Sequence, residues 1–374
     1  MKQLTMCVDM GASETKYNID ELVLHQALSN NMVLRSEPSA TNKFSNERLE
    51  NFEMCVTTED DKTGTPIEPL LGKYVSFGSY ATRGLDVSTK PSIDDKKCTQ
   101  SLNYASVLAV IAYEVERGNL WGEIKVALAV PPIELTQAQK KFAALIGKYK
   151  VLLVGGGRIP EFEAEFEITG VTCYSEPMLT STAFLFAKRG LKHPELMKKT
   201  LLLFDIGAST TDVGIVQNGV YIERTQKTIR IGGNMIRDML KDAIYEEHEV
   251  LLAREALEEA VKCGYIELCG EKVSIVDLLD QTREHCALRI REAMATYFKD
   301  AEIDAKTLSA LVFSGGGSLS AKAEDDDADI HDEHSVGTYI AAQFGKLPVY
   351  TYGEDARFAN VDGLVLHELM ASKK

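Results

Sequence analysis

Two short stretches of the chain place the same residue types at the same spacing. The first reads VDMGASET at residues 8–15, and the second reads FDIGASTT at residues 204–211, more than halfway along the chain. In both, an apolar run leads to an aspartate, then to Gly-Ala-Ser and a threonine. Glycine lets another group approach the backbone closely, and a turn of this kind can aim several backbone N–H groups at one anion. Each stretch is therefore suited to hold a phosphate.

The aspartate in front of each tip needs a different chemical role. Asp9 and Asp205 cannot bind phosphate directly because like charges repel, but they fit if Mg²⁺ or a polarised water lies between. Lys16 follows the first tip and could neutralise phosphate charge as a point cation. Two such hairpins facing each other would grip a polyphosphate from both sides. For either stretch alone, the alternative is a plain β-hairpin with turn residues.

Two further glycine-rich turns follow in the second half of the chain. One is Ile231-Gly232-Gly233-Asn234, and the other is SGGGS at residues 314–318. The ordinary explanations are a helix N-terminal turn for the first and a strand-to-helix turn for the second. After two phosphate hairpins, both become candidates for the nucleoside of a nucleotide, since flat rings need backbone without side chains.

The elements that must position these turns alternate along the chain. We expect strands at residues 4–8, 16–19, 123–130, 151–154, 163–168, 171–174, 308–313 and 346–350, with a second hairpin and a further strand across 200–224. We expect helices at residues 103–117, 136–149, 177–189 and 356–369, and a strongly helical, charged region at 233–306. This pattern predicts an α/β protein whose two halves are built alike.

Composition narrows the class of protein. With 374 residues, 45% of them hydrophobic and 26% charged, the chain has room for two globular domains. A net charge of −15 argues against direct binding of nucleic acid or an anionic membrane. The longest apolar run is too short to span a bilayer. Seven cysteines without CxxC spacing predict reduced, mostly structural thiols in the cytoplasm.

Five motifs in order resemble the superfamily of actin, DnaK-type chaperones and sugar kinases. VDMGASETK and FDIGASTTDV are similar to its two phosphate motifs, and VFSGGGS to its adenosine motif. YSEPMLTSTAF and FANVDGLVL, with Asn360 and Gly363, resemble its two connecting helices. The resemblance implies a bilobed, actin-like α/β fold of two duplicated ribonuclease-H-like domains, with inserted small subdomains and a nucleotide cleft between them.

The same resemblance implies where the two lobes lie in the sequence. The first lobe would comprise residues 1–175, with an inserted subdomain at about 35–100, and would be completed by 351–374. The second lobe would comprise residues 176–350, with a helical insertion at about 233–306.

Roles for individual residues follow from the resemblance as well. Asp9 and Asp205 would hold Mg²⁺ through its waters, and Asp205 could also orient the attacking water. Glu176 would polarise that water in line with the γ-phosphate, although an acid at a helix N-terminus is also favourable in itself. The catalytic residues implied are thus Glu176, Asp205 and Asp9. The nucleotide-binding residues implied are Gly11, Ala12, Ser13, Thr15, Lys16, Gly207, Ala208, Ser209, Thr210, Gly232, Gly233, Gly315, Gly316 and Gly317.

Within the superfamily, the chain is most similar to plasmid-segregation actins of the ParM kind. Little chain follows FANVDG, we find no sugar-kinase signature, and neither terminus reads as an amphipathic membrane anchor. The stretch IRIGGNMIRDML and the short subdomain at 35–100 carry the similarity to ParM.

This placement implies a cytoplasmic ATPase that uses ATP and Mg²⁺, with GTP left open as the nucleotide. It would form filaments with copies of itself and move plasmids through a DNA-binding adaptor, without touching nucleic acid or membrane directly. The alternative is a non-polymerising small-molecule kinase or a reactivating factor of the same superfamily.

Overall fold

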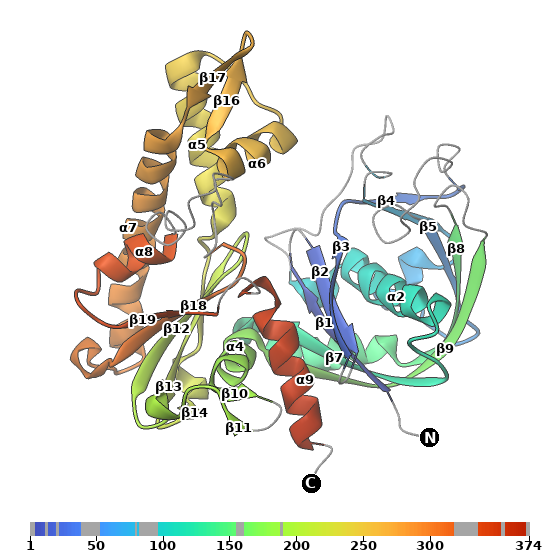
Figure 1. Cartoon of the computed structure of the whole chain (residues 1–374). Coiled ribbons are helices and arrows are strands. Elements are labelled where there is room, and N and C mark those ends of the chain that lie inside the picture. The colour runs from blue at the N-terminus through green and yellow to red at the C-terminus, as the bar shows by residue number, and fades with distance from the viewer. Residues whose placement is uncertain are drawn as a thin grey trace. The chain divides into compact units, whose positions relative to one another are not determined.

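The computed structural model describes residues 4–11, 14–19, 22–38, 53–78, 81, 96–154, 161–187, 190–317, 336–352 and 356–371. Contacts divide the chain into two compact units, one of Met1–Leu179 with Asn360–Lys374 and one of Thr180–Ala359. The lobes expected from the sequence, 1–175 with 351–374 and 176–350, differ from these units at both boundaries. Each unit contains its own mixed sheet (Figure 1).

The first unit is built on a nine-stranded sheet in the order β3-β2-β1-β7-β9-β8-β5-β6-β4. β1 is antiparallel to β2 and parallel to β7, which in turn is parallel to β9. The strands are β1 (Leu4–Met10), β2 (Glu14–Ile19), β3 (Leu22–Ser29), β4 (Met32–Arg35), β5 (Glu53–Thr57), β6 (Tyr74–Phe77), β7 (Glu123–Val130), β8 (Gly147–Val154) and β9 (Phe162–Ser175).

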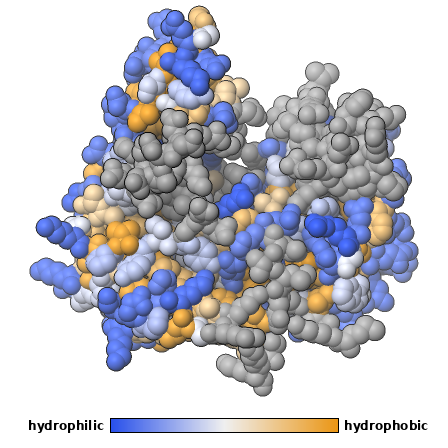
Figure 2. All heavy atoms as spheres, viewed as in Figure 1, coloured by the Kyte–Doolittle hydropathy of each residue, from blue (hydrophilic) through white to orange (hydrophobic). Residues whose placement is uncertain are grey.

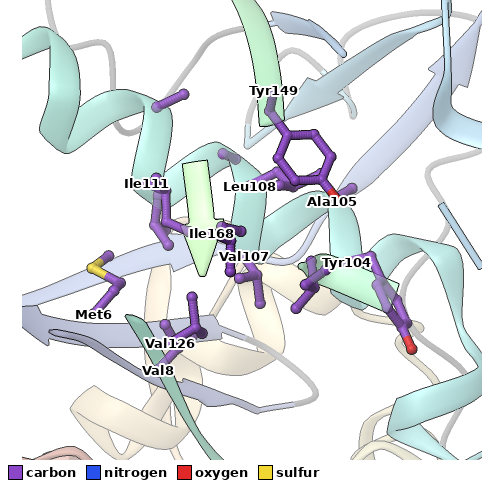
Figure 3. Close-up of a cluster of buried hydrophobic side chains, with 14 of the residues drawn as sticks. Met6, Val8, Tyr104, Ala105, Val107, Leu108, Ile111, Val126, Tyr149 and Ile168 are labelled. Atoms are coloured by element: carbon purple, nitrogen blue, oxygen red, sulfur yellow. The ribbon is translucent and has the colours of Figure 1, made fainter. Parts of the chain in front are cut away.

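Helices cover both faces of this first sheet. On one face, α2 (Ser101–Glu116) packs Val107, Leu108 and Ile111 into a core shared with Met6 and Val8 of β1 (Figure 3). On the other face, side chains of α9 (Ala359–Ala371) and of the start of α4 (Glu176–Leu185) cover Cys7, Ala127 and Ala129. Because β1 and β7 are buried on both faces, they are almost continuously apolar.

The second unit repeats the same arrangement of strands. β12 is antiparallel to β13 and parallel to β18, which is parallel to β19, just as β1 relates to β2, β7 and β9. The strands of this sheet are β12 (Thr200–Ile206), β13 (Thr211–Gln217), β14 (Val220–Tyr221), β15 (Lys227–Ile229), β18 (Ala310–Ser314) and β19 (Val349–Thr351). A separate two-stranded sheet joins β10 (Phe186–Ala187) to β11 (Gly190–Leu191).

The central strand β12 contributes side chains to two different cores. Leu202 and Phe204 pack with α7 (Val276–Asp300) and α8 (Val336–Ala342), whereas Leu201 and Leu203 pack with Phe184 and Leu196. Successive side chains of a strand point to opposite faces. The continuous apolar run that leads to Asp205 is therefore the signature of a strand covered on both sides.

A helical insertion extends from this second sheet. It contains α5 (Gly233–His248), α6 (Arg254–Cys263), the hairpin of β16 (Tyr265–Leu268) and β17 (Glu271–Ser274), and the start of α7. Its own small core includes Leu240, Ile244 and Leu257, while hydrophilic side chains predominate on its visible surface (Figure 2). Among all helices in the described ranges, none is long and apolar enough to cross a bilayer.

Two sequence expectations about secondary structure, at 136–149 and at 233–306, were wrong in part. The helix expected at 136–149 is α3 (Leu135–Phe142), which is followed by strand β8. Within the described part of the region 35–100, β5 and β6 belong to the first sheet, which they join through β8. The region 233–306 contains the unexpected hairpin β16–β17, whose turn residues Cys269 and Gly270 have positive φ values of 51° and 85°, as tight hairpin turns require.

Candidate functional site

Each of the two duplicated stretches turns just after its aspartate and glycine, and we call this an Asp-Gly turn. The first Asp-Gly turn lies at the end of β1. Asp9 pairs with Lys16 across the β1–β2 ladder, and the N–H of Gly11 donates to the carbonyl of Glu14 at 2.9 Å to close the tip. A Cβ on Gly11 would lie 2.9 Å from that same carbonyl oxygen, so any other residue would open the turn. The predicted Ala12 and Ser13 lie outside the described residues.

The second Asp-Gly turn is closed by an equivalent hydrogen bond. Asp205 pairs with Asp212 across the β12–β13 ladder, and the N–H of Gly207 donates to the carbonyl of Thr210 at 2.8 Å. Gly207 thus holds the position that Gly11 holds in the first unit. The duplicated turn expected from the sequence is present in both units, at the end of equivalent strands.

The carboxylate of Asp9 is buried and lies among polar groups of the first unit. Its Oδ2 is 3.6 Å from Lys16 Nζ and 3.5 Å from Asn360 Nδ2, and its Oδ1 is 4.0 Å from Lys97 Nζ. Asn360 comes from α9, in the motif that resembles the second connecting helix. Two lysines and one amide therefore surround an aspartate that is only 4% exposed.

Glu176 is the first residue of α4 and is 6% exposed. Its Oε1 makes a 2.6 Å ion pair with Lys97 Nζ, so Lys97 lies between the two carboxylates of Asp9 and Glu176. Burial alone would lower the pKa of Lys97, but these two carboxylates raise it above its usual value. Lys97 is thus a fully charged cation inside the predicted site. Sequence reasoning missed it because it belongs to no motif.

In the second unit, the SGGGS turn that begins at Ser314 packs against Asp205. Ser314 donates from Oγ to Oδ1 of Asp205 at 3.3 Å, and the N–H of Gly317 donates to the carbonyl of Ile206 at 2.7 Å. A Cβ on Gly317 would lie 2.9 Å from the carbonyl oxygen of Gly207. Gly316 lies between these contacts, next to Arg357. The two turns can only approach this closely because the residues are glycines.

The predicted Gly232-Gly233 turn packs against the same hairpin tip. Gly233 donates its N–H to the carbonyl of Gly207 at 3.0 Å, and Asn234 donates its N–H to that of Ala208 at 2.6 Å. A Cβ on Gly232 would lie 2.7 Å from the Gly207 oxygen. Since α5 begins at Gly233, this turn is also the helix N-terminal turn that the sequence left as the plain alternative.

Solved structures of actin-like proteins match the chain along its whole length. The archaeal actin homolog Ta0583 matches at 15% identity with a TM-score of 0.69, over 99% of this chain and 100% of that one. ParM of Bacillus thuringiensis with ATP matches at 13% identity and 0.66, over 100% of both chains. Actin-like protein Alp7A matches at 15% identity and 0.69, over 100% of this chain and 97% of its own.

Part of the second unit also matches a family model. Residues 203–324 match the C-terminal model of the archaeal, MreB-like actin homologues. The chain has an actin-like fold. The mixed α/β fold expected from the five motifs is therefore confirmed, with two mixed sheets that carry equivalent hairpins.

Within this actin-like fold, Thr15 has a different role from the one expected. Its side chain is fully buried, and its hydroxyl donates to Oδ1 of Asn30 at 2.8 Å. A threonine hydroxyl has one proton to donate. Thr15 therefore stabilises the hairpin through Asn30, with its hydroxyl proton directed away from any phosphate.

Ser209 and Thr210 remain at the tip of the second hairpin. Ser209 Oγ accepts a hydrogen bond from Asn234 Nδ2 at 2.9 Å, which leaves its own O–H able to donate. Thr210 is half-buried, and its carbonyl oxygen accepts the bond that closes the turn.

Two helices of the first unit, α4 and α9, pack closely against each other. A Cβ on Gly363 of α9 would collide with the backbone of Leu179 in α4. The absence of a side chain at Gly363 lets α9 approach α4, and the same two helices carry Asn360 and Glu176. Gly363 therefore sets the spacing of residues around Asp9.

The acidic residues of the site suit a particular kind of metal binding. Among the described residues, no three or more His, Cys, Asp and Glu side chains are grouped so that they could hold a metal ion. Asp9 and Asp205 are each a single buried carboxylate at a strand end. Mg²⁺ commonly takes one or two carboxylates and completes its shell with water and substrate phosphates, so each of these carboxylates by itself is of a kind that fits a magnesium ion arriving with a nucleotide.

Proposed function

We propose that the chain binds ATP with Mg²⁺ at its two Asp-Gly hairpins and hydrolyses it to ADP and phosphate. The observation that carries this proposal is the same closed turn in each unit, with a buried aspartate at the preceding strand end. Similar structures support the choice of nucleotide, because Ta0583 was solved as a complex with ADP and B. thuringiensis ParM with ATP and with AMPPNP.

The phosphates would be held by the backbone and hydroxyls of the two tips. Gly11, Ala12 and Ser13 would serve in the first tip with Lys16 as counter-charge, and the second tip would use Gly207, Ala208, Ser209 and Thr210. The nucleoside would lie against the glycine turns that pack on the second tip, formed by Gly232, Gly233, Gly315, Gly316 and Gly317.

Three carboxylates would carry the chemistry. Asp9 and Asp205 would hold Mg²⁺ through its water ligands, and Mg²⁺ would neutralise charge that develops on the phosphates. Glu176 would accept a proton from the attacking water or hold that water in line with the γ-phosphate. Its place beside Asp9, on a helix start that packs on the first sheet, suits both tasks.

We further propose that nucleotide binding controls assembly of the chain into filaments that segregate plasmids through a DNA-binding adaptor. A head-to-tail contact that does not close on itself generates a filament. Support comes from the matches to ParM and Alp7A structures. A further ParM match, from pCBH, is described as a non-polymerisable quadruple mutant. The net charge of −15 favours an adaptor over direct contact with DNA.

The test is sedimentation of the purified protein with ATP and Mg²⁺, combined with electron microscopy and phosphate release. We expect filaments with ATP, and a release rate per molecule that rises with protein concentration. Asp205→Asn should abolish hydrolysis, whereas Asp242→Asn on the exposed face of α5 should not. No filaments well above micromolar concentration, together with intact ATP binding, would overturn the filament proposal. Phosphate transfer only to an added acceptor would favour the kinase alternative.

A further inference from the structure

Lys97 has a position in the first unit that the proposed function does not yet use. Its ammonium is 2.6 Å from Glu176 Oε1 and 4.0 Å from Asp9 Oδ1. The first carboxylate is the proposed base and the second the proposed magnesium ligand. The inference below rests on the proposed ATP hydrolysis and asks how the site distinguishes ATP from ADP.

The backbone that carries Lys97 is firmly held. Lys97 begins a short 3-10 turn, Lys97–Thr99. Its carbonyl accepts from Asn103 Nδ2 at 2.9 Å, and the carbonyl of Cys98 accepts from the Tyr104 hydroxyl at 2.9 Å. The buried Glu134 accepts the Cys98 N–H at 3.5 Å. With its Cα fixed in this way, only the flexible four-carbon stem of Lys97 is left to move.

The ion pair with Lys97 leaves Glu176 poorly suited to act as a base. Lys97 Nζ donates a hydrogen bond to Glu176 Oε1 at 2.6 Å. The ammonium occupies one oxygen through which Glu176 would hold a water molecule. In this arrangement the carboxylate is present but blocked.

A γ-phosphate would change the balance of charges around Lys97. It brings further negative oxygens to the first hairpin, and a lysine ammonium binds phosphate as a compact point charge. ADP would not supply that group. Because the Lys97 backbone is fixed, a short movement of its side chain would transfer the ammonium from the Glu176 carboxylate to the γ-phosphate.

We propose that Lys97 is a latch that pairs with Glu176 until a γ-phosphate draws it away. In the bound state Lys97 contacts the γ-phosphate, and Glu176 is released to hold the attacking water. The same movement gives ATP an interaction that ADP lacks, so Lys97 both times the release of the base and determines the preference for ATP. No covalent step is assigned to Lys97 itself.

The test is to measure the dissociation constants of ADP and of a non-hydrolysable ATP analogue, both with Mg²⁺, for five variants. Lys97→Gln should weaken binding of the analogue by roughly 10- to 100-fold, the loss expected for a charge-assisted contact, and change ADP binding by less than about threefold. Glu176→Gln should strengthen analogue binding by roughly fivefold or more, the lower end of typical coupling between sites, because it frees Lys97. In the double variant this gain should disappear.

Lys96→Gln is the matched control. Lys96 adjoins Lys97 but is exposed, and it donates to Gln137 outside the site. It should leave both dissociation constants unchanged. Lys97→Arg, which keeps the positive charge, should retain part of the preference for the ATP analogue. Thermal melting of every variant shows whether it is folded.

A purely structural ion pair would give a different pattern. If Lys97→Gln weakened both nucleotides equally, or if Glu176→Gln weakened the analogue, the latch would be overturned. These results remain separable from failure of the proposed function, which would show as a wild-type chain that does not bind the analogue at all.

Discussion

The Cα of Gly315 packs directly against the carboxylate of Asp205. A Cβ on Gly315 would collide with Oδ1 of Asp205 and with the carbonyl oxygen of Ile206. Gly315 also has a φ of 83°, in the region that glycine occupies without strain. The SGGGS turn thus fixes the proposed magnesium ligand Asp205 by leaving no room between its backbone and that carboxylate.

Replacing Gly315 should therefore destabilise the second unit. Gly345 has nearly the same conformation, with φ of 80°, but a Cβ there meets nothing within 4 Å. Gly345→Ala should lower the free energy of unfolding by about 1 kcal/mol, the cost of the left-handed conformation alone. Gly315→Ala should lose a further ~1–3 kcal/mol for overpacking and weaken nucleotide binding. Urea unfolding gives the free energy of unfolding of the two variants. Equal losses would show that the contact between an added Cβ at position 315 and Asp205 does not destabilise the protein.

The buried hydrogen bond between Thr15 and Asn30 leads to a prediction that separates a role in stabilising the hairpin from a role in binding ATP. Thr15→Val keeps the shape of the side chain but leaves Oδ1 of Asn30 without the hydroxyl donor. We expect about 1–3 kcal/mol less stability and an almost unchanged dissociation constant for ATP. Thr15→Ser, which keeps the hydroxyl, should retain more of the stability. A tenfold loss of ATP affinity in a fully stable Thr15→Val variant would instead make Thr15 a ligand.

The cysteines should differ sharply in reactivity. Burial raises the pKa of Cys173 to about 12 and that of Cys286 to about 11, while Cys269 is exposed in the β16–β17 turn. Alkylation acts on the thiolate, so iodoacetamide at pH 8 should label Cys269 well before Cys173 or Cys286. Mass spectrometry of the native protein gives the order, with urea-denatured protein as the control. Equally rapid labelling of Cys173 would contradict the burial of β9.

His367 on α9 predicts a dependence of stability on pH. Burial lowers the pKa of this imidazole, whose ring lies 5.3 Å from that of Tyr174. The unfolded chain then binds a proton at about pH 6.5, whereas the folded chain binds it only at lower pH. Stability should be constant above pH 6.5 on this account, fall as the pH drops below it, and level off beneath the folded pKa.

Urea unfolding of wild type and His367→Gln across this range tests the assignment. The variant should lose part of the decline below pH 6.5, whatever its stability at neutral pH. His285→Gln, an exposed histidine on α7, controls for the removal of a histidine. An identical decline in wild type and His367→Gln would assign the effect to other groups.

The hairpins could be predicted from the sequence because their signals are local. An apolar run, an aspartate and a glycine turn are neighbours in the chain, and each copy folds with its nearest strand. The residues before Tyr149 favour a helix and predict one through Tyr149, yet Tyr149 pairs with Phe166 of β9 across the sheet. That pairing is a contact between distant segments, and local propensity does not contain it.

Lys97 shows the same limit for the site. Its partner Glu176 is 79 residues further along the chain, and no spacing rule joins a lysine in a 3-10 turn to a carboxylate at a helix start. Thr15 shows the converse, since a residue that matches the motif points its hydroxyl toward Asn30. A motif identifies the backbone of a site more securely than the direction of each side chain.

The first unit is built from two separate segments of the chain, and this affects how the protein folds during synthesis on the ribosome. The second unit, Thr180–Ala359, is one continuous stretch, whereas the first needs both Met1–Leu179 and Asn360–Lys374. Domains fold as units while the chain is being made. All of the second unit, residues 180–359, is synthesised before α9 is complete. In contrast, Cys7, Ala127 and Ala129 of the first unit can be covered only after Val361 and Leu364 of α9 have been synthesised. The half of the protein that is translated first is thus completed last, and until then it exposes an apolar face that a chaperone could recognise.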